Sequence, residues 1–331
     1  APGKVDPAKA DVIATVTVRE SGDVDREGEP VTGGIPFAIG QLSANTKLML
    51  VDAGGRVVPL QTRVLRTWPD GSIKWLLVDF QADLKGGASA SWRLIKRPAV
   101  DVPAPPASPL KVLEDDKAVR IDTGPMQATI SKAHFDLISN VVIDGKPAAM
   151  APGGGLRITD MDGDVRGGDA ADLAPGYTVE VTERGPMRVV VRASGEMKAT
   201  PKHRLGFTCW YHFAAGRRDV RVFFTMRNLD GQTITHTDQR SVADAKFQKW
   251  LADKPGNVTV KAVDLIVPTA KREKDRAVLG GWDKPHKLTA GKLYQDSAAS
   301  WHWQAGEDAI FDPVLEANKK WMSENAPEGK R

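Results

Sequence analysis

The chain has 331 residues, which is too many for one compact β module and about right for two. No apolar run approaches the roughly 20 residues of a membrane-spanning helix, so no membrane span is expected. The 46 basic and 42 acidic residues are interspersed and give a net charge of +4, which argues against nucleic acid as a partner and suits an acidic polysaccharide.

The first residues and the cysteine content bear on where the chain works. It begins Ala1-Pro2-Gly3-Lys4, a small polar start of the kind left by signal-peptide cleavage, so we expect a secreted protein, periplasmic or extracellular. Its single cysteine, Cys209, excludes an internal disulfide. Because Cys209 lies in the apolar run 207–211, a buried structural thiol is favoured over a nucleophile.

The first hundred residues have the pattern of short β-strands joined by turns. Strand-forming runs at 62–68 and 72–81 flank Pro69-Asp70-Gly71, and Asp-Gly tolerates the positive φ angles of tight hairpin turns. No convincing helix is present, so the pattern predicts a small antiparallel barrel or sandwich over residues 10–97. The other strands expected here are 12–18, 47–51, 57–60 and 89–96.

A proline-rich segment then divides the chain. Residues 98–109 contain five prolines, which fix φ and cannot donate to a sheet, so we expect an extended linker and a domain boundary.

Longer strands follow the linker. In residues 220–228, apolar side chains at 220, 222, 224 and 226 alternate with a second set, the period of a strand with one face buried. The pattern predicts a large antiparallel β-sandwich over 110–312, and thus an all-β fold with minor helices. The helices are expected at 242–251 and 313–325, the second within a terminal helix and tail at 313–331.

One cluster of candidate catalytic residues lies on the strand expected at 204–213. It comprises His203, Arg204, Tyr211 and His212. Polysaccharide β-elimination needs a Tyr or His to take the proton α to the uronate carboxyl and an Arg to neutralise that carboxyl group. The odd spacing of His203 and His212 places them on opposite faces of a continuous strand, unless a bulge intervenes.

Acidic and aromatic residues offer two further candidate sites. Alternating Asp160, Asp162 and Asp164 suit an oxygen-ligated Ca²⁺ loop, although a solvated turn explains the same residues and no EF-hand pattern is present. Nine tryptophans suit sugar stacking, for which we single out Trp282, Trp301 and Trp303, although tryptophan is also a core residue. The glycine pairs match no nucleotide-binding motif, so no nucleotide cofactor is expected.

Segments in both halves resemble one known family. In the first half these are 30–37, which contains Gly34-Ile35-Pro36, then 58–62, and then Trp68-Pro69-Asp70-Gly71-Ser72-Ile73-Lys74-Trp75. Together they resemble the N-terminal RIFT barrel of the exo-rhamnogalacturonan lyase family, whose relatives include YetA-like proteins. The segments 185–192, 211–213 and 220–228 resemble the central β-sandwich of that family. The resemblance implies a RIFT-type barrel followed by a sandwich, over roughly residues 12–310.

Enzymes of that family continue into a long α/α-toroid domain, which the two short helical segments of this sequence cannot form. The resemblance therefore implies an architecture and a polysaccharide context, and leaves open whether the chain is an enzyme. The leading hypothesis is a secreted, non-catalytic pair of β modules that resembles the front part of a polysaccharide lyase and acts with a further domain or protein partner. The alternatives are a complete small lyase with its site at Tyr211 and His212, and a structural or assembly module of the cell envelope.

Overall fold

The computed structural model describes residues 3–6, 10–98, 107–149, 154–160, 162–167, 173, 175–200, 203–229 and 260–267, together with the backbone of five short strands between 277 and 310. The chain divides into two compact units, Ala1–Leu229 with Val260–Thr269, and Asp230–Thr259 with Ala270–Arg331. Every regular element of the described residues is a β-strand, which confirms the predicted all-β fold. The helices expected at 242–251 and 313–325 lie outside the described residues, as do residues 99–106 of the expected linker.

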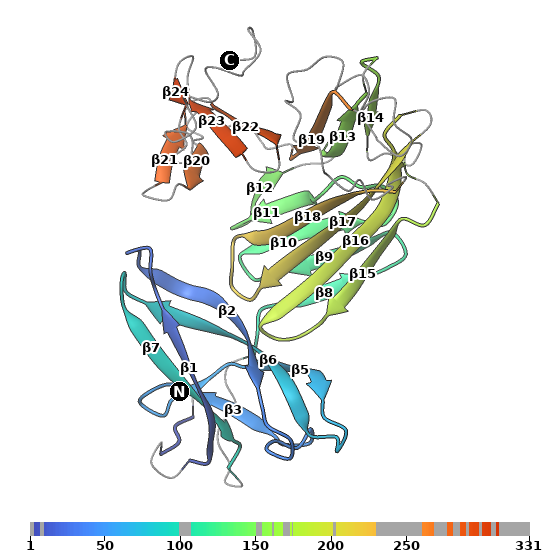
Figure 1. Ribbon diagram of the computed structural model, residues 1–331. Coiled ribbons are helices and arrows are strands. Elements are labelled where there is room, and N and C mark those ends of the chain that lie inside the picture. The colour runs from blue at the N-terminus through green and yellow to red at the C-terminus, as the bar shows by residue number, and fades with distance from the viewer. Residues whose placement is uncertain are drawn as a thin grey trace, which may run out of the picture. The chain divides into compact units, whose positions relative to one another are not determined.

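The N-terminal barrel is built from seven strands in two antiparallel sheets (Figure 1). The first sheet has the order β1-β7-β3-β4 and the second the order β2-β6-β5. The strands are β1 (Val12–Arg19), β2 (Arg26–Pro36), β3 (Leu48–Val51), β4 (Val57–Val58), β5 (Gln61–Thr67), β6 (Ile73–Leu84) and β7 (Ser89–Lys96).

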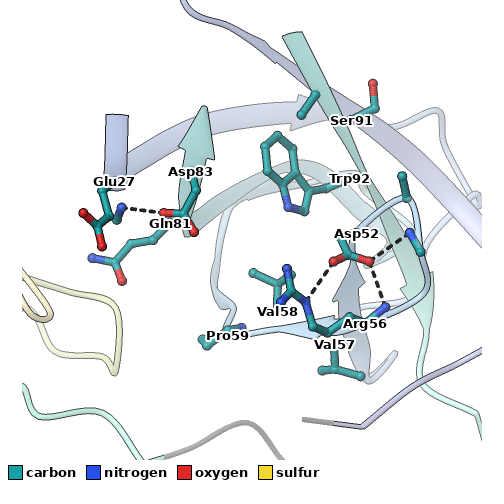
Figure 2. A pocket seen from close by; sticks show the side chains of 14 residues that line it. Glu27, Asp52, Arg56, Val57, Val58, Pro59, Gln81, Asp83, Ser91 and Trp92 are labelled. Carbon is teal, nitrogen blue, oxygen red and sulfur yellow. Dashed lines mark hydrogen bonds and ion pairs between the residues drawn. The ribbon is translucent and has the colours of Figure 1, made fainter. Parts of the chain in front are cut away.

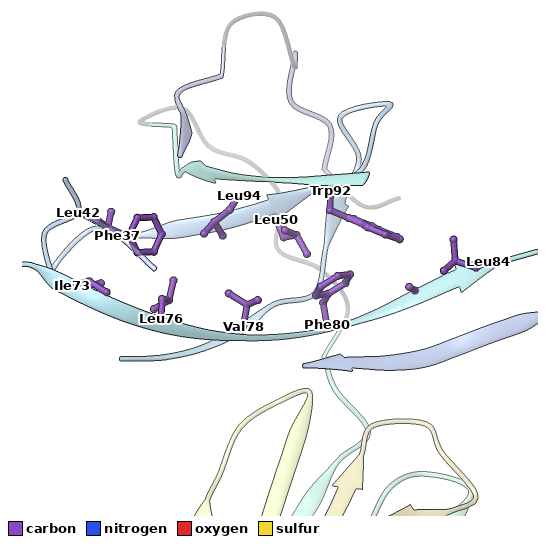
Figure 3. Close-up of a cluster of buried hydrophobic side chains, with 11 residues drawn as sticks. Phe37, Leu42, Leu50, Ile73, Leu76, Val78, Phe80, Leu84, Trp92 and Leu94 are labelled. Carbon is purple, nitrogen blue, oxygen red and sulfur yellow. The ribbon is translucent and has the colours of Figure 1, made fainter. Parts of the chain in front are cut away.

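The long strand β6 separates the barrel core from a second, polar face. Leu76, Val78 and Phe80 point into the core, where they meet side chains of β3 and β7 such as Leu50 and Trp92 (Figure 3). The rings of Phe80 and Trp92 lie 5.1 Å apart. On the opposite face of β6, Asp79, Gln81 and Asp83 present polar groups to other parts of the chain.

The turn between β5 and β6 is stabilised by its own side chains and backbone. Gly71 has φ +82°, a conformation that side chains disfavour, and Trp68 N donates to Ser72 O at 2.8 Å to close the hairpin. Asp70 Oδ1 accepts from Ser72 N, and Lys74 Nζ lies 4.1 Å from the centroid of the Trp68 ring. The residues that carry the family resemblance thus hold the hairpin together.

The second domain packs one five-stranded and one four-stranded antiparallel sheet. Their orders are β12-β11-β10-β9-β8 and β15-β16-β17-β18. The first sheet contains β8 (Lys111–Glu114), β9 (Ala118–Asp122), β10 (Met126–Ser131), β11 (Ser139–Ile143) and β12 (Lys146–Ala149), and the second contains β15 (Thr178–Glu183), β16 (Arg188–Lys198), β17 (Arg204–Ala214) and β18 (Val220–Asn228).

Strand β17 shows how the sandwich core forms. Phe207, Cys209, Tyr211 and Phe213 alternate along the strand and all are buried between the sheets. Phe207 lies 4.5 Å from the ring of Phe135, which comes from the loop between β10 and β11. Cys209 is a buried free thiol, as predicted, and burial raises its pKa to about 11.

Smaller sheets complete the described structure. Within the first unit, β14, β13 and β19 form a three-stranded sheet. In the second unit, β20 pairs with β21, and β22, β23 and β24 form another antiparallel sheet. These strands are β13 (Gly155–Thr159), β14 (Val165–Gly167), β19 (Ala262–Ile266), β20 (Ala277–Gly280), β21 (Pro285–Leu288), β22 (Gly291–Ser297), β23 (Ser300–Ala305) and β24 (Ala309–Ile310).

Direct hydrogen bonds join the barrel to the sandwich inside the first unit. Gln61 Oε1 of β5 accepts from the backbone amides of Met187 and Arg188, at 3.0 and 2.9 Å. Gln81 Nε2 of β6 donates to Ala215 O at 2.6 Å. The polar face of β6 is therefore turned towards the start of β16 and the end of β17.

Candidate functional site

The outer face of the β15–β18 sheet, directed away from the sandwich core, carries the candidate site. In the antiparallel register His212 lies opposite Arg221, and Trp210 lies opposite both Arg192 and Phe223, so these side chains share one face. We call this set the outer face. It consists of Arg192, Trp210, His212, Arg221 and Phe223.

Aromatic and cationic groups of the outer face touch one another. The Arg192 guanidinium lies 5.6 Å from the centroid of the Trp210 ring, and the rings of His212 and Phe223 meet edge to face at 5.3 Å. Phe223 is 52% exposed, although large aromatic side chains are usually buried. Exposed aromatic planes beside guanidinium groups are what a surface needs to stack sugar rings and pair with their carboxylates.

A cavity of about 510 Å³ opens beside this face, where the sandwich meets the barrel. The sandwich lines it with Arg188, His212, Arg221 and Phe223, and the barrel contributes the segment 29–32 of β2. The volume falls in the range typical of small-molecule sites. His212 and Arg221 therefore belong both to the outer face and to the cavity wall.

An ion network anchors Arg188 at the floor of this junction. Its Nε lies 3.1 Å from Asp79 Oδ1 of the barrel, and its Nη2 donates to Glu183 Oε2 at 2.6 Å. Glu183 also pairs with Arg63 of β5 at 2.7 Å. Burial raises the pKa of Asp79, against the lowering effects of a hydrogen bond from Thr32 and the charge of Arg188. Arg188 is thus committed to fixing the junction.

The imidazole of His212 is held neutral. Burial lowers its pKa below the usual value, and the charges of Arg188 and Arg221 lower it further. Arg188 Nη1 lies 3.5 Å from His212 Nδ1, and a guanidinium can only donate, so Nδ1 accepts and the proton of the neutral ring is assigned to Nε2. The site therefore offers a ligand an N–H donor at Nε2.

Tyr211 and His212, which we expected to act together, lie on opposite faces of β17. Tyr211 is fully buried in the sandwich core, and its hydroxyl donates to Leu137 O at 2.5 Å. Burial raises its pKa well above the usual value, so the phenol stays protonated. The structure gives Tyr211 a core position and leaves His212 at the cavity.

His203 and Arg204 lie at the other end of the same strand. Nine residues of extended chain separate His203 from His212, which corresponds to about 30 Å. His203 Nδ1 lies 2.9 Å from Thr200 Oγ1, and Arg204 faces Glu196 at 3.7 Å. The structure therefore does not bring the four expected catalytic residues into one site.

The acidic loop is held by its own hydrogen bonds. Asp160 is buried, and its Oδ1 accepts from the backbone amides of Asp162 and Asp164 while its Oδ2 pairs with Arg166 at 2.6 Å. The hydrogen bond from Arg166 lowers the pKa of Asp160. Across the described part of the chain, no group of three or more His, Cys, Asp or Glu side chains is placed to hold a metal ion. A Ca²⁺ role for this loop stays a prediction from the sequence.

The tryptophans chosen for sugar binding fall in the second unit. Trp301 and Trp303 lie in β23, and Trp282 lies outside the described residues. Their role also stays a prediction. Trp210 was missed, although it stands in the same apolar run as Cys209. Trp210 lies between two residues of β17 that face the core, so the two-residue period of a strand could have placed it on the opposite face.

The fold and the site define the chain as a two-domain β protein with a RIFT-type barrel and a central sandwich. The family model described as the PcRGLX-like N-terminal RIFT barrel domain matches residues 17–85. The model described as the PcRGLX-like protein central beta sandwich domain matches residues 110–237. Together the two models cover more than half of the chain, which therefore belongs to the PcRGLX-like family, as its sequence motifs predicted.

The chain is also similar in sequence to one curated protein, over part of its length. The chain is 29% identical over 205 residues to the uncharacterized protein YetA of Bacillus subtilis (strain 168), and the match covers 59% of this chain. It covers 23% of YetA, so the chain spans less than a quarter of that relative's length.

Proposed function

We propose that the chain is the polysaccharide-binding front part of a rhamnogalacturonan lyase-like protein, working outside the cell, and that the outer face holds an acidic glycan. The single observation that supports this most strongly is that the exposed ring of Phe223 and the half-buried ring of Trp210 share one sheet face with the guanidinium groups of Arg192 and Arg221. Within the described residues, no helix has the length and apolarity needed to cross a membrane.

The chemistry of the outer face favours a ligand with carboxylates on a sugar backbone. Trp210 and Phe223 lie on neighbouring strands and present rings on which pyranose C–H faces can pack. Arg221 lies beside them and forms no ion pair with any residue that the structure describes, so its guanidinium is available for a bidentate bond to a uronate. The neutral imidazole of His212 adds a donor for a sugar hydroxyl.

Calorimetric titration with oligogalacturonate and with rhamnogalacturonan oligosaccharides tests this proposal. Trp210→Ala should weaken binding about tenfold or more, because truncation of a central aromatic anchor removes most of its contact area. Trp75→Ala is the matched control, since Trp75 is 40% exposed but lies on β6 of the barrel. Equal losses in the two variants, or no binding by the native chain, would refute the proposal.

A second candidate function is catalysis of β-elimination with His212 as the base. It is supported by the neutral state of His212 and by the positive charges of Arg188 and Arg221 beside it, which would stabilise a carboxylate as it becomes an enolate. For that role Arg188 has to release Nδ1, the ring nitrogen with the free electron pair. This requirement is why we place binding first.

The two candidates separate in an assay for unsaturated uronate, followed by ultraviolet absorbance. Binding alone predicts no product from oligogalacturonate or rhamnogalacturonan. Catalysis predicts turnover that His212→Gln abolishes and His203→Gln leaves unchanged, because His203 lies about 30 Å away along the strand. Turnover that persists in both variants would rule out His212 as the catalytic base.

A further inference from the structure

A second cavity, of about 660 Å³, lies within the barrel and takes no part in the site described above. Figure 2 shows residues of β2, β4, β6 and β7 around it. Val57, Val58 and Pro59 form an apolar wall, and Trp92 closes it from the side of β7. We call this space the barrel cavity. Its volume is typical of ligand sites.

Trp92 presents its indole N–H to this cavity (Figure 2). The residue is only 6% exposed, and its indole N–H has no hydrogen-bond partner in any part of the chain that the structure describes. By contrast, the indole of Trp68 donates to Phe37 O at 3.0 Å. Because an indole N–H can only donate, a ligand that lies against Trp92 can match it with an oxygen acceptor.

The rim of the barrel cavity is acidic. Glu27, Asp52 and Asp83 line it with a single guanidinium, that of Arg56, which pairs with Asp52 at 3.0 Å. One oxygen of Asp83 accepts from Gly28 N at 2.7 Å, and its other oxygen remains as an acceptor. The excess of carboxylates disfavours anionic ligands, and carboxylates accept hydrogen bonds well from hydroxyl groups.

These features together select one chemical class. An anion is repelled by the rim, a simple cation has no acceptor for the indole N–H, and a purely apolar molecule satisfies neither the indole nor the carboxylates. An uncharged sugar has hydroxyl donors, oxygen acceptors and an apolar C–H face for the wall of valine and proline.

We propose that the barrel cavity binds an uncharged sugar residue, with its hydroxyls donating to Asp83 and Glu27 and one of its oxygens accepting from Trp92 Nε1. This site is separate from the outer face, which takes carboxylated sugars. The chain would then recognise both a charged and an uncharged sugar through two different domains.

Saturation-transfer NMR titrations of the whole chain test this site. The probes are the methyl glycosides of glucose, galactose, mannose and rhamnose, with sodium galacturonate as the charged comparison. At least one neutral glycoside should bind saturably, and Trp92→Phe, which keeps an aromatic ring in the core, should weaken it roughly fivefold to tenfold through loss of one hydrogen bond.

Asp83→Asn provides a second, isosteric variant that does not disturb the barrel core and should weaken the same glycoside to a similar extent. Asp25→Asn is the control, because Asp25 lies on the same barrel but does not line the cavity. The proposal is overturned if no glycoside of the panel binds saturably, or if Asp83→Asn binds as the native chain does. Retained binding of oligogalacturonate by Trp92→Phe would show that the outer face works independently.

Discussion

Replacement of Arg188 by Met should destabilise the junction of barrel and sandwich far more than its exposed area suggests. The side chain of Arg188 is 12% exposed, and it neutralises two carboxylates, Asp79 and Glu183, that are 4% and 11% exposed. Removing one partner of a buried ion pair costs about 3–5 kcal/mol, because the remaining charges stay desolvated without compensation. For a unit of this size that loss lowers the melting temperature by about 6–20 °C.

The pH dependence of this loss follows from Asp79. Its pKa is raised in the folded protein, so the folded state binds more protons than the unfolded state and stability falls as pH rises through the folded pKa. Without Arg188 the pKa of Asp79 rises further, because a charge that lowers it has been removed. The difference in stability between Arg188→Met and the native chain should therefore shrink as the pH is lowered towards the unfolded value of Asp79.

Urea or thermal denaturation between neutral pH and about pH 4 measures both effects. Arg192→Met is the matched control on the same strand, since its pair with Glu180 is exposed at 39% and 50% and is expected to contribute less than about 1 kcal/mol. A loss in Arg188→Met no larger than in the control, or one that is the same at every pH, would show that the network does not hold the junction.

Three further predictions concern single side chains. Tyr211→Phe should cost about 1–3 kcal/mol in urea denaturation by leaving Leu137 O without its donor, and should leave oligogalacturonate binding unchanged; a loss of binding alone would contradict the core position. Cys209 should resist thiol reagents at pH 8 in the native chain and react on unfolding, because its pKa is raised to about 11, and fast native labelling would contradict this. Gly155→Ala should lower the melting temperature strongly, since φ is +101° and a Cβ would lie 2.1 Å from Phe135 O; a native-like melting curve would show that this strand is placed differently.

Most of the fold was predicted from the two-residue alternation of apolar and polar side chains along the strands. In β18 the apolar residues at 220, 222, 224 and 226 are more buried than their neighbours, as the two-residue period requires. The turn at Asp70-Gly71 was equally predictable, because these two residue types by themselves favour the positive φ that Gly71 adopts. The family motifs at 68–75 gave the barrel type, which periodicity alone could not.

The site was harder to predict because it depends on which face of a strand is covered. Neighbouring residues of a strand point to opposite sides, and this rule, applied to His203 and His212, also separates Tyr211 from His212. The buried pair of Asp79 and Arg188 joins two domains across a large separation in sequence. No local pattern indicates such a contact. The two-residue period already puts Phe223 on the face opposite Phe224, but only the register of β17 with β18 shows that Phe223 lies beside Trp210.

The central claim is that the outer face recognises the carboxylates of an acidic glycan through Arg221. Calorimetric titration of the native chain and of Arg221→Gln, each with oligogalacturonate and with its carboxyl-reduced form, tests this most directly. We expect the native chain to favour the acidic form about tenfold or more, as a charge-assisted bidentate bond allows, and Arg221→Gln to lose most of that preference. Equal affinity of the native chain for the two forms, or an unchanged preference in Arg221→Gln, would contradict the account.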